Sequence, residues 1–202
     1  MELLRKRLTK TPVRFLNEEP ARLLASAVDP SVLSDPIPVP AAGEKNWALA
    51  INGAKATASS QYDRGGANCG PSGLIDGVRN SANWMKGHGW ASQPGQPLPQ
   101  WVQIAFPQAR SISRFVVITY TAGDDPSSLN TWGVKNYNIE IWDSESSSWK
   151  PVVSEKKDRL LVNRVHVLEK PVRATKFRVT VRAVAPPDGI SRLLQVEAWG
   201  RE

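Results

Sequence analysis

The chain has 202 residues, of which 41% are hydrophobic, and it contains eight tryptophans. This length and composition suffice for one globular domain and exclude a wholly disordered chain. The formal net charge is +7, and residues 46–202 carry most of it, with nineteen basic and thirteen acidic residues. No run approaches the ~18 consecutive apolar residues of a membrane-spanning helix, so no membrane span is predicted. The single cysteine, Cys69, excludes a disulfide framework and a cysteine metal cluster.

Residues 1–45 differ in composition from the rest of the chain and are predicted to form an arm or linker. A short helix is expected at about residues 18–28, because Asn17 precedes two glutamates and an early proline. Four prolines within residues 30–40 then predict an extended, stiff linker. The segment is either a plain connector or an arm that docks on a protein partner, and the sequence leaves both open. The first residues are charged but lack a following apolar region, so no signal peptide is predicted in this chain.

From residue 46 onward, alternating apolar and polar residues predict an all-β fold of about eight strands. The clearest alternation lies in residues 101–106, 137–142, 175–184 and 194–199. Residues 112–120 form a longer apolar run, which is typical of a central strand covered on both faces. Turns rich in glycine, proline, asparagine and aspartate favour a β-sandwich or jelly roll, with residues 46–202 as one domain.

A stretch at residues 73–103 combines tryptophans with glycines and prolines, which is incompatible with a single helix or strand. Asp76 lies in this stretch between Ile75 and Gly77, so its carboxylate is expected to start a turn and to need donors or a cation. Core packing is expected for four tryptophans of the chain: Trp90, Trp101, Trp142 and Trp149.

Catalytic motifs are absent from the sequence. It has no Gly-x-Ser-x-Gly elbow, no His-Glu-x-x-His helix and no phosphate-binding glycine loop. Asp124 and Asp125 are adjacent, so they do not form the separated carboxylate pair of a glycosidase. His166 flanks an apolar strand and is expected to be a packed or capping histidine. The sequence therefore predicts a protein that is not an enzyme.

Nine motifs occur in the order and spacing of a known family. They are Asn46-Trp-Ala-Leu-Ala, Ala56-Thr-Ala-Ser-Ser, Leu74-Ile-Asp-Gly, Trp90-Ala-Ser, Pro99-Gln-Trp-Val-Gln-Ile, Tyr137-Asn-Ile-Glu-Ile-Trp, Trp149, His166 and Arg192-Leu-Leu-Gln-Val-Glu-Ala-Trp-Gly200. Together they resemble the coagulation factor 5/8 type C (discoidin) domain and, within it, the bacterial carbohydrate-binding modules of family 32. The resemblance covers about residues 46–202. It implies an eight-stranded jelly-roll β-sandwich, similar to galactose-binding domains, with a glycan held by loops at one end. It also implies an extracellular or cell-surface location.

In many bacterial members, the resemblance further implies a structural calcium that ties the Asp-Gly loop to the last strand. The candidate ligands here are Leu74, Asp76, Asn80, Ser81, Gln195 and Glu197. Calcium takes ~6 to 8 oxygen ligands. Gln195 stands where the family commonly has a carboxylate, and its neutral amide is a weaker ligand. The alternative is that Asp76 and Glu197 only accept backbone hydrogen bonds at turns.

Three loops are expected to carry the ligand: residues 61–68, 84–88 and 121–132. Sugar recognition needs an aromatic face for the C–H side of the ring and planar polar groups for its hydroxyls. Trp84 or Trp132 is the expected platform, with Tyr62 as a further possibility and core packing as the alternative for each. The expected hydrogen-bonding residues are Arg64, His88, Asp124 and Asn130.

Two other functions compete with glycan binding. One is a structural or adaptor role in a larger assembly, docked through residues 1–45. The other is electrostatic binding of nucleic acid or anionic lipid by residues 150–182, which hold ten basic and three acidic residues. Basic residues alternate with apolar ones there, which is also typical of a solvated sheet face. Few aromatics suited to base stacking are interleaved, so nucleic-acid binding ranks last.

Overall fold

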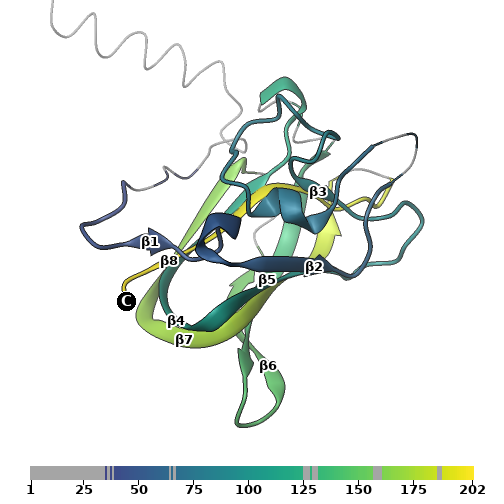
Figure 1. The fold of residues 1–202 in the computed structure, drawn as a ribbon. Coiled ribbons are helices and arrows are strands. Elements are labelled where there is room, and N and C mark those ends of the chain that lie inside the picture. The colour runs from purple at the N-terminus through teal and green to yellow at the C-terminus, as the bar shows by residue number, and fades with distance from the viewer. Residues whose placement is uncertain are drawn as a thin grey trace, which may run out of the picture.

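The chain folds into a β-sandwich, seen in a computed structural model that describes residues 35, 37, 39–63, 65, 67–124, 128, 132–156, 161–185 and 188–202. Its elements are β1 (Lys45–Asn46), η2 (Ala50–Asn52), β2 (Lys55–Ala58), η4 (Pro71–Leu74), β3 (Trp90–Ala91), β4 (Gln100–Thr119), η5 (Ala122–Asp124), β5 (Val134–Asp143), β6 (Ser148–Glu155), β7 (Asn163–Val184) and β8 (Arg192–Gly200). The strands form one antiparallel sheet in the order β1-β8-β4-β7-β5-β6, with β2 on β4 and β3 on β8 (Figure 1). The all-β prediction is confirmed, whereas the helix predicted at 18–28 lies outside the described residues. No described helix is both long and apolar enough to span a bilayer.

Two long strands carry the sheet from one layer of the sandwich to the other. Residues 100–105 of β4 pair with residues 176–181 of β7, and residues 110–118 pair with residues 163–174 after a register shift. The first stretch extends to β2, β5 and β6, and the second extends to β8 and β1. Such irregularities bend a strand and increase its twist. The two strands curve together in Figure 1, so one hydrogen-bonded sheet supplies both layers.

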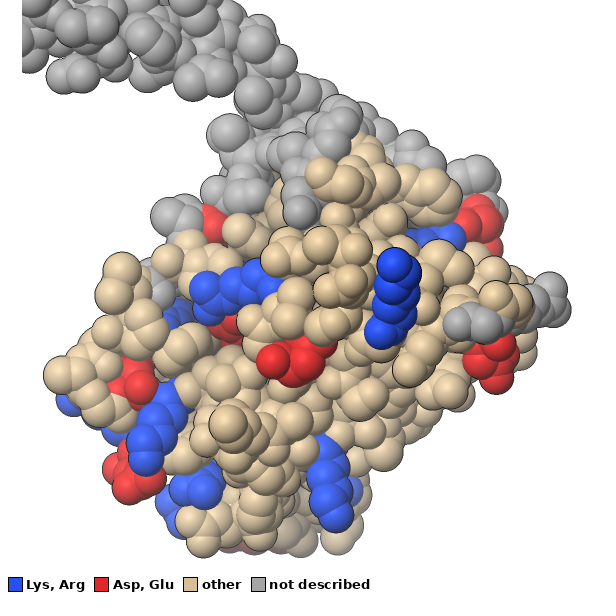
Figure 2. All heavy atoms as spheres, turned by 45° about the horizontal axis from the view of Figure 1, so that its top comes forward, with Lys and Arg blue, Asp and Glu red and all other residues tan. Residues whose placement is uncertain are grey.

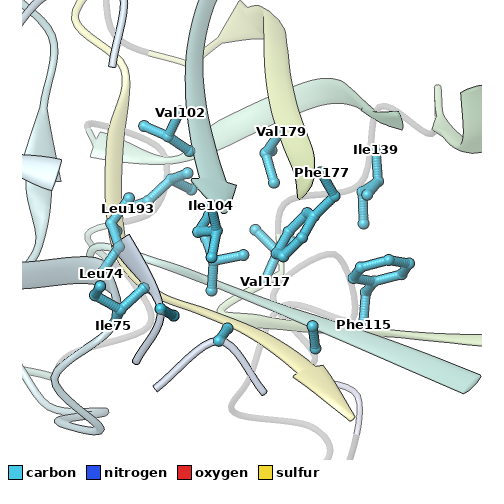
Figure 3. Close-up of a cluster of buried hydrophobic side chains, with 14 of the residues drawn as sticks. Leu74, Ile75, Val102, Ile104, Phe115, Val117, Ile139, Phe177, Val179 and Leu193 are labelled. Atoms are coloured by element: carbon cyan, nitrogen blue, oxygen red, sulfur yellow. The ribbon is translucent and has the colours of Figure 1, made fainter. Parts of the chain in front are cut away.

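The core lies between these layers and is built from alternate residues of the strands. Val102, Ile104 and Phe177 point inward from the first layer and are fully buried. Phe115 and Val117 face them from the second layer (Figure 3). The ring centroids of Phe115 and Phe177 lie 5.0 Å apart. Burial of each such side chain stabilises the fold by about 1.5 to 3 kcal/mol.

The apolar run at residues 112–120 forms a central stretch of β4, as its sequence predicts. Phe115 and Val117 enter the core, while Val116 and Ile118 enter a second apolar cluster on the opposite face. Partly buried residues such as Ile37 and Trp199 cover that second cluster. The strand is therefore covered on both faces.

The expectation that four tryptophans pack in the core is right for one of them. Trp90 is fully buried, but Trp101, Trp142 and Trp149 are only half-buried. The reason lies in strand alternation: Val102 and Ile139 point into the core, so Trp101 and Trp142 point outward. Trp142 and Trp149 are cross-strand partners and meet edge to face at 5.3 Å.

A glycine at the end of β8 provides a test of the packing between β8 and β4. A Cβ atom at Gly200 would overlap the carbonyl oxygen of Ser111. We expect Gly200→Ala to lower the free energy of unfolding by about 2 to 3 kcal/mol, because one backbone must move. At this chain length the melting temperature should fall by roughly 4 to 12 °C in a thermal scan. Arg201→Ala, at the exposed position directly after β8, is the control, and an equal loss in both variants would contradict this interpretation.

Candidate binding pocket at the loop end

A pocket of about 320 Å³ opens where β4 ends and β8 begins. We call this part of the sandwich the loop end; it lies opposite the β5–β6 turn in Figure 1. The residues that line the pocket are Tyr62, Cys69, Trp84, Met85, Ala91, Tyr120, Trp132, Asp188, Ile190 and Arg192. They come from segments far apart in the chain, and the strand ends bring them together.

Three aromatic side chains form a continuous wall along the pocket. The rings of Trp84 and Tyr120 stack at 4.0 Å with 23° between their planes. Trp132 meets Tyr120 edge to face at 6.5 Å. Offset-stacked and edge-to-face pairs are the favoured aromatic geometries, so the wall is held by contacts among its own members.

An ion pair supplies the polar part of the pocket. Arg192 Nη2 lies 2.5 Å from Asp188 Oδ2, and Arg192 Nη1 donates to the Ile190 carbonyl at 3.2 Å. The guanidinium carbon also lies 4.5 Å from the Trp132 ring centroid, which adds a cation–π contact. Burial raises the pKa of Asp188, but hydrogen bonds from Arg192 and from the Ile190 N–H outweigh it, and the net pKa lies below its usual value. Asp188 is therefore an anion at neutral pH.

The position of Trp84 depends on glycines in the loop that follows it. A Cβ at Gly89 would overlap the Trp84 ring, and Gly89 has a φ of 71°. The Gly89 N–H donates to the Gly73 carbonyl at 3.1 Å. A side chain on Gly73 would also clash with the backbone of Gly89. The Asn68 N–H donates to the Met85 carbonyl at 2.8 Å. These close contacts fix the Trp84 loop against η4.

Three of the predicted ligand-binding residues line this pocket: Tyr62, Trp84 and Trp132. His88 is directed elsewhere, because its Nδ1 lies 2.6 Å from Asp76 Oδ2. Arg64 and Asn130 lie outside the described residues, and of Asp124 only the backbone, at the end of η5, is described. The predicted roles of all these residues in ligand binding stay predictions.

The sequence reasoning missed Tyr120, Asp188 and Arg192. Tyr120 ends the apolar run and was read only as part of a strand. Asp188 and Arg192 are four residues apart across a glycine-containing turn. Two opposite charges at this spacing, next to the start of a strand, were the sequence signal that could have predicted the ion pair.

Two reactive side chains near the core are held in inert environments. Burial raises the pKa of the Cys69 thiol, which outweighs the opposing effects of a Met85 backbone hydrogen bond and of Arg192. A thiol of this kind is a poor nucleophile. His166 Nε2 lies 2.6 Å from the hydroxyl of buried Tyr137, in agreement with its expected packing role.

The residues predicted to bind calcium are brought close in part, but they already have protein partners. Glu197 receives two hydrogen bonds from Arg79, at 2.6 and 2.9 Å. Asp76 receives the His88 contact and a 2.7 Å hydrogen bond from the Val78 N–H. Two further predicted ligands, Asn80 and Ser81, also accept hydrogen bonds within the protein. Asn80 accepts from the Ala82 N–H at 3.1 Å, and the Ser81 carbonyl accepts from the Trp84 N–H at 3.0 Å.

Gln195 completes this arrangement from β8. Its amide orientation is assigned from its neighbours: the nitrogen donates to the Leu74 carbonyl at 3.1 Å and to Asp76 Oδ1 at 3.2 Å. The oxygen then accepts from the Gly77 N–H at 3.2 Å. Among the described residues, no three His, Cys, Asp or Glu side chains are grouped to hold a metal. As arranged, these donors do not fit a calcium ion.

Comparisons with solved structures define the class of fold. The chain is similar to the family 32 carbohydrate-binding module of C. perfringens NanJ in complex with galactose, with a TM-score of 0.59 and 17% identity over 78% of this chain and 99% of that one. The family 32 module of Streptococcus pneumoniae EndoD has a TM-score of 0.59 and 18% sequence identity, and the match covers 78% of this chain and 100% of that one. Chitosan-binding module 1 of a Paenibacillus sp. IK-5 chitosanase/glucanase has a TM-score of 0.57 and 23% sequence identity, and the match covers 77% of this chain and 99% of that one. These similarities establish a β-sandwich fold like that of the family 32 modules.

A family comparison matches residues 55–195 to the F5/8 type C domain. The chain belongs to this family, as its motifs predicted. A search of curated protein sequences found no significant match.

The Asp188–Arg192 pair predicts a pH dependence of stability. Because the folded-state pKa of Asp188 is depressed, its contribution is present above the usual carboxyl pKa of 3.8 and is lost as the pH falls through the folded value. We expect Asp188→Asn to melt at a lower temperature than the wild type at pH 7, and the difference to shrink below about pH 4. Asp63→Asn, which alters an exposed aspartate, is the control. A difference that does not change with pH would contradict this prediction.

Proposed function

We propose that this protein is a non-catalytic carbohydrate-binding module that holds one sugar residue in the loop-end pocket. The observation that carries the proposal is the aromatic wall of Trp84, Tyr120 and Trp132 beside the Asp188–Arg192 pair. An aromatic face suits the C–H side of a sugar, and a carboxylate and a guanidinium suit its hydroxyl groups. Related modules described above are named for galactose and chitosan binding, which supports this ligand class.

The volume and charge of the pocket narrow the ligand. At about 320 Å³ the pocket is near the lower end of small-molecule sites, so it suits one ring better than a buried chain. Asp188 and Arg192 neutralise each other, which favours a neutral sugar. Figure 2, with the top of Figure 1 turned forward, shows charged side chains of both signs scattered among uncharged ones. A structural calcium is no part of this proposal, because neither Asp76 nor Glu197 lines the pocket.

Direct titration tests the pocket. We expect Trp132→Ala to weaken binding of galactose or an N-acetylated hexosamine by about tenfold or more, which corresponds to about 1.4 kcal/mol. Arg192→Met should weaken it similarly, because it removes both the guanidinium and the partner of Asp188. Calorimetry gives the affinities, and circular dichroism checks that each variant is folded.

The matched control is Trp142→Ala, which removes a half-buried tryptophan far from the pocket on the outer sheet face. It should leave sugar affinity unchanged. Equal losses in Trp142→Ala and Trp132→Ala would contradict the assigned pocket. The whole proposal fails if the folded protein binds no glycan on an array at millimolar concentration.

A second candidate function has a specific observation in its favour. On the outer face of β5, β6 and β7, Lys176 lies 4.1 Å from the Trp142 ring centroid and Arg178 lies 4.5 Å from that of Trp149. Arg182 is exposed further along β7. We call the surface of these five residues the basic face. Its combination of cations and aromatic rings suits an acidic polysaccharide.

Charge pairing lowers the net positive charge of the basic face. Glu140 accepts hydrogen bonds from Arg178 at 2.7 Å and from Thr180 at 2.6 Å. Burial raises the pKa of Glu140, but these two bonds and nearby Arg182 outweigh it and lower the pKa. Glu140 therefore neutralises part of the face at neutral pH. For this reason we rank polyanion binding below sugar binding.

Salt dependence tests the basic face with heparin as the probe. If three cations carry the binding, the affinity should fall on the order of 10-fold between 50 and 200 mM salt. Lys176→Met combined with Arg182→Ala should remove most of this dependence. Binding that is insensitive to salt, or unaffected by the double variant, would contradict it.

The adaptor function through residues 1–45 stays a prediction. Nearly all of that segment lies outside the described residues.

A further inference from the structure

The loop of residues 74–80, which we call the Asp-Gly loop, is attached to β8 by hydrogen bonds from Arg79 to Glu197 and between the loop and Gln195. Glu197 is only 2% exposed, and its carboxylate is matched by the two Arg79 hydrogen bonds and by a 2.7 Å bond from Trp199 Nε1. Gln195 is fully buried and connects to both ends of the turn, at Leu74 and Gly77. A buried carboxylate or amide without such partners would strongly destabilise the fold.

The chemistry of these contacts is opposite to that of a calcium site. Calcium is bound by ~6 to 8 oxygen atoms that point at the ion. Here nitrogen atoms point at the oxygens: Arg79 at Glu197, and His88 and Gln195 at Asp76. The Arg79 guanidinium would in addition repel a nearby divalent cation.

We propose that Arg79, His88 and Gln195 replace the structural calcium of related modules, so that the Asp-Gly loop is anchored without metal. Gln195, in place of a carboxylate, removes one anionic oxygen ligand for calcium. It supplies an N–H hydrogen-bond donor instead. Arg79 supplies the positive charge that Glu197 requires. The loop then reaches β8 through direct hydrogen bonds rather than through a shared ion.

This anchor also positions the pocket. Gly73 lies directly before the Asp-Gly loop, and its carbonyl accepts a hydrogen bond from the Gly89 N–H. The Trp84 ring packs against Gly89. His88, the neighbour of Gly89, is tied to Asp76. The aromatic wall is thereby linked to β8 through a continuous series of protein contacts.

Thermal unfolding of the full chain in 1 mM calcium and in excess EDTA tests the proposal. We expect the same melting temperature in both solutions. A calcium ion present at a hundred times its Kd would instead raise the melting temperature by roughly 5 to 10 °C. Such a rise, or one bound calcium by calorimetric titration, would overturn the proposal. Because the readout is stability, it is independent of whether the pocket binds a sugar.

Variants of the anchor give the second arm of the experiment. Arg79→Met leaves Glu197 buried with its charge unmatched, so the melting temperature should fall by about 6 °C or more in calcium and EDTA alike. Gln195→Leu removes the three amide hydrogen bonds and should also lower it in both solutions. Lys170→Met, at an exposed cation of β7, is the matched control and should not change it. Variants as stable as the control would show that these residues are not the anchor.

Discussion

The antiparallel pairing of β4 with β7 is the constraint on which the rest of the structure depends. Each strand is about twenty residues long, and the paired stretches of the two strands are separated by two register shifts. Because both strands belong to both layers, the layers cannot separate without breaking this ladder. Phe115 and Phe177 lie on opposite stretches of it and meet in the core. The ladder thus fixes the distance between the layers as well as their order.

The pocket inherits its geometry from the ends of these strands. Tyr120 directly follows β4, Arg192 begins β8 and Ala91 ends β3. Each is therefore placed by backbone hydrogen bonds rather than by a free loop. Other lining residues lie outside the strands, and among them Trp84 belongs to a loop that depends on close backbone contacts at Gly73 and Gly89. A rigid strand frame with one glycine-dependent loop explains how a small aromatic pocket forms from distant segments.

Strand alternation made the fold predictable from the sequence, because one face of each strand must be buried. The same rule, applied position by position, would have placed Trp101 and Trp142 on the outer face. The pocket was predictable where an aromatic stood in a predicted loop, as with Tyr62, Trp84 and Trp132. The Asp188–Arg192 pair is local in sequence, whereas the partner of His88 was not predictable, because Asp76 reaches it through a tertiary contact between loops. Asp76 accepts from the Val78 N–H at the start of a turn, as expected, and its other contacts are with Gln195 of β8 and with His88.

Charge pairing separates the surfaces of this molecule into two kinds. Along β8, Arg192 pairs with Asp188 and Glu197 pairs with Arg79, so these charges cancel locally. Local cancellation in a partly buried region weakens long-range attraction for ions, whether a metal or an acidic ligand. On the basic face, Glu140 offsets only part of the charge of Arg178, Arg182 and their neighbours. Charge pairing therefore favours a neutral ligand at the pocket and would favour an anionic one at the basic face, a difference that the net charge alone does not reveal.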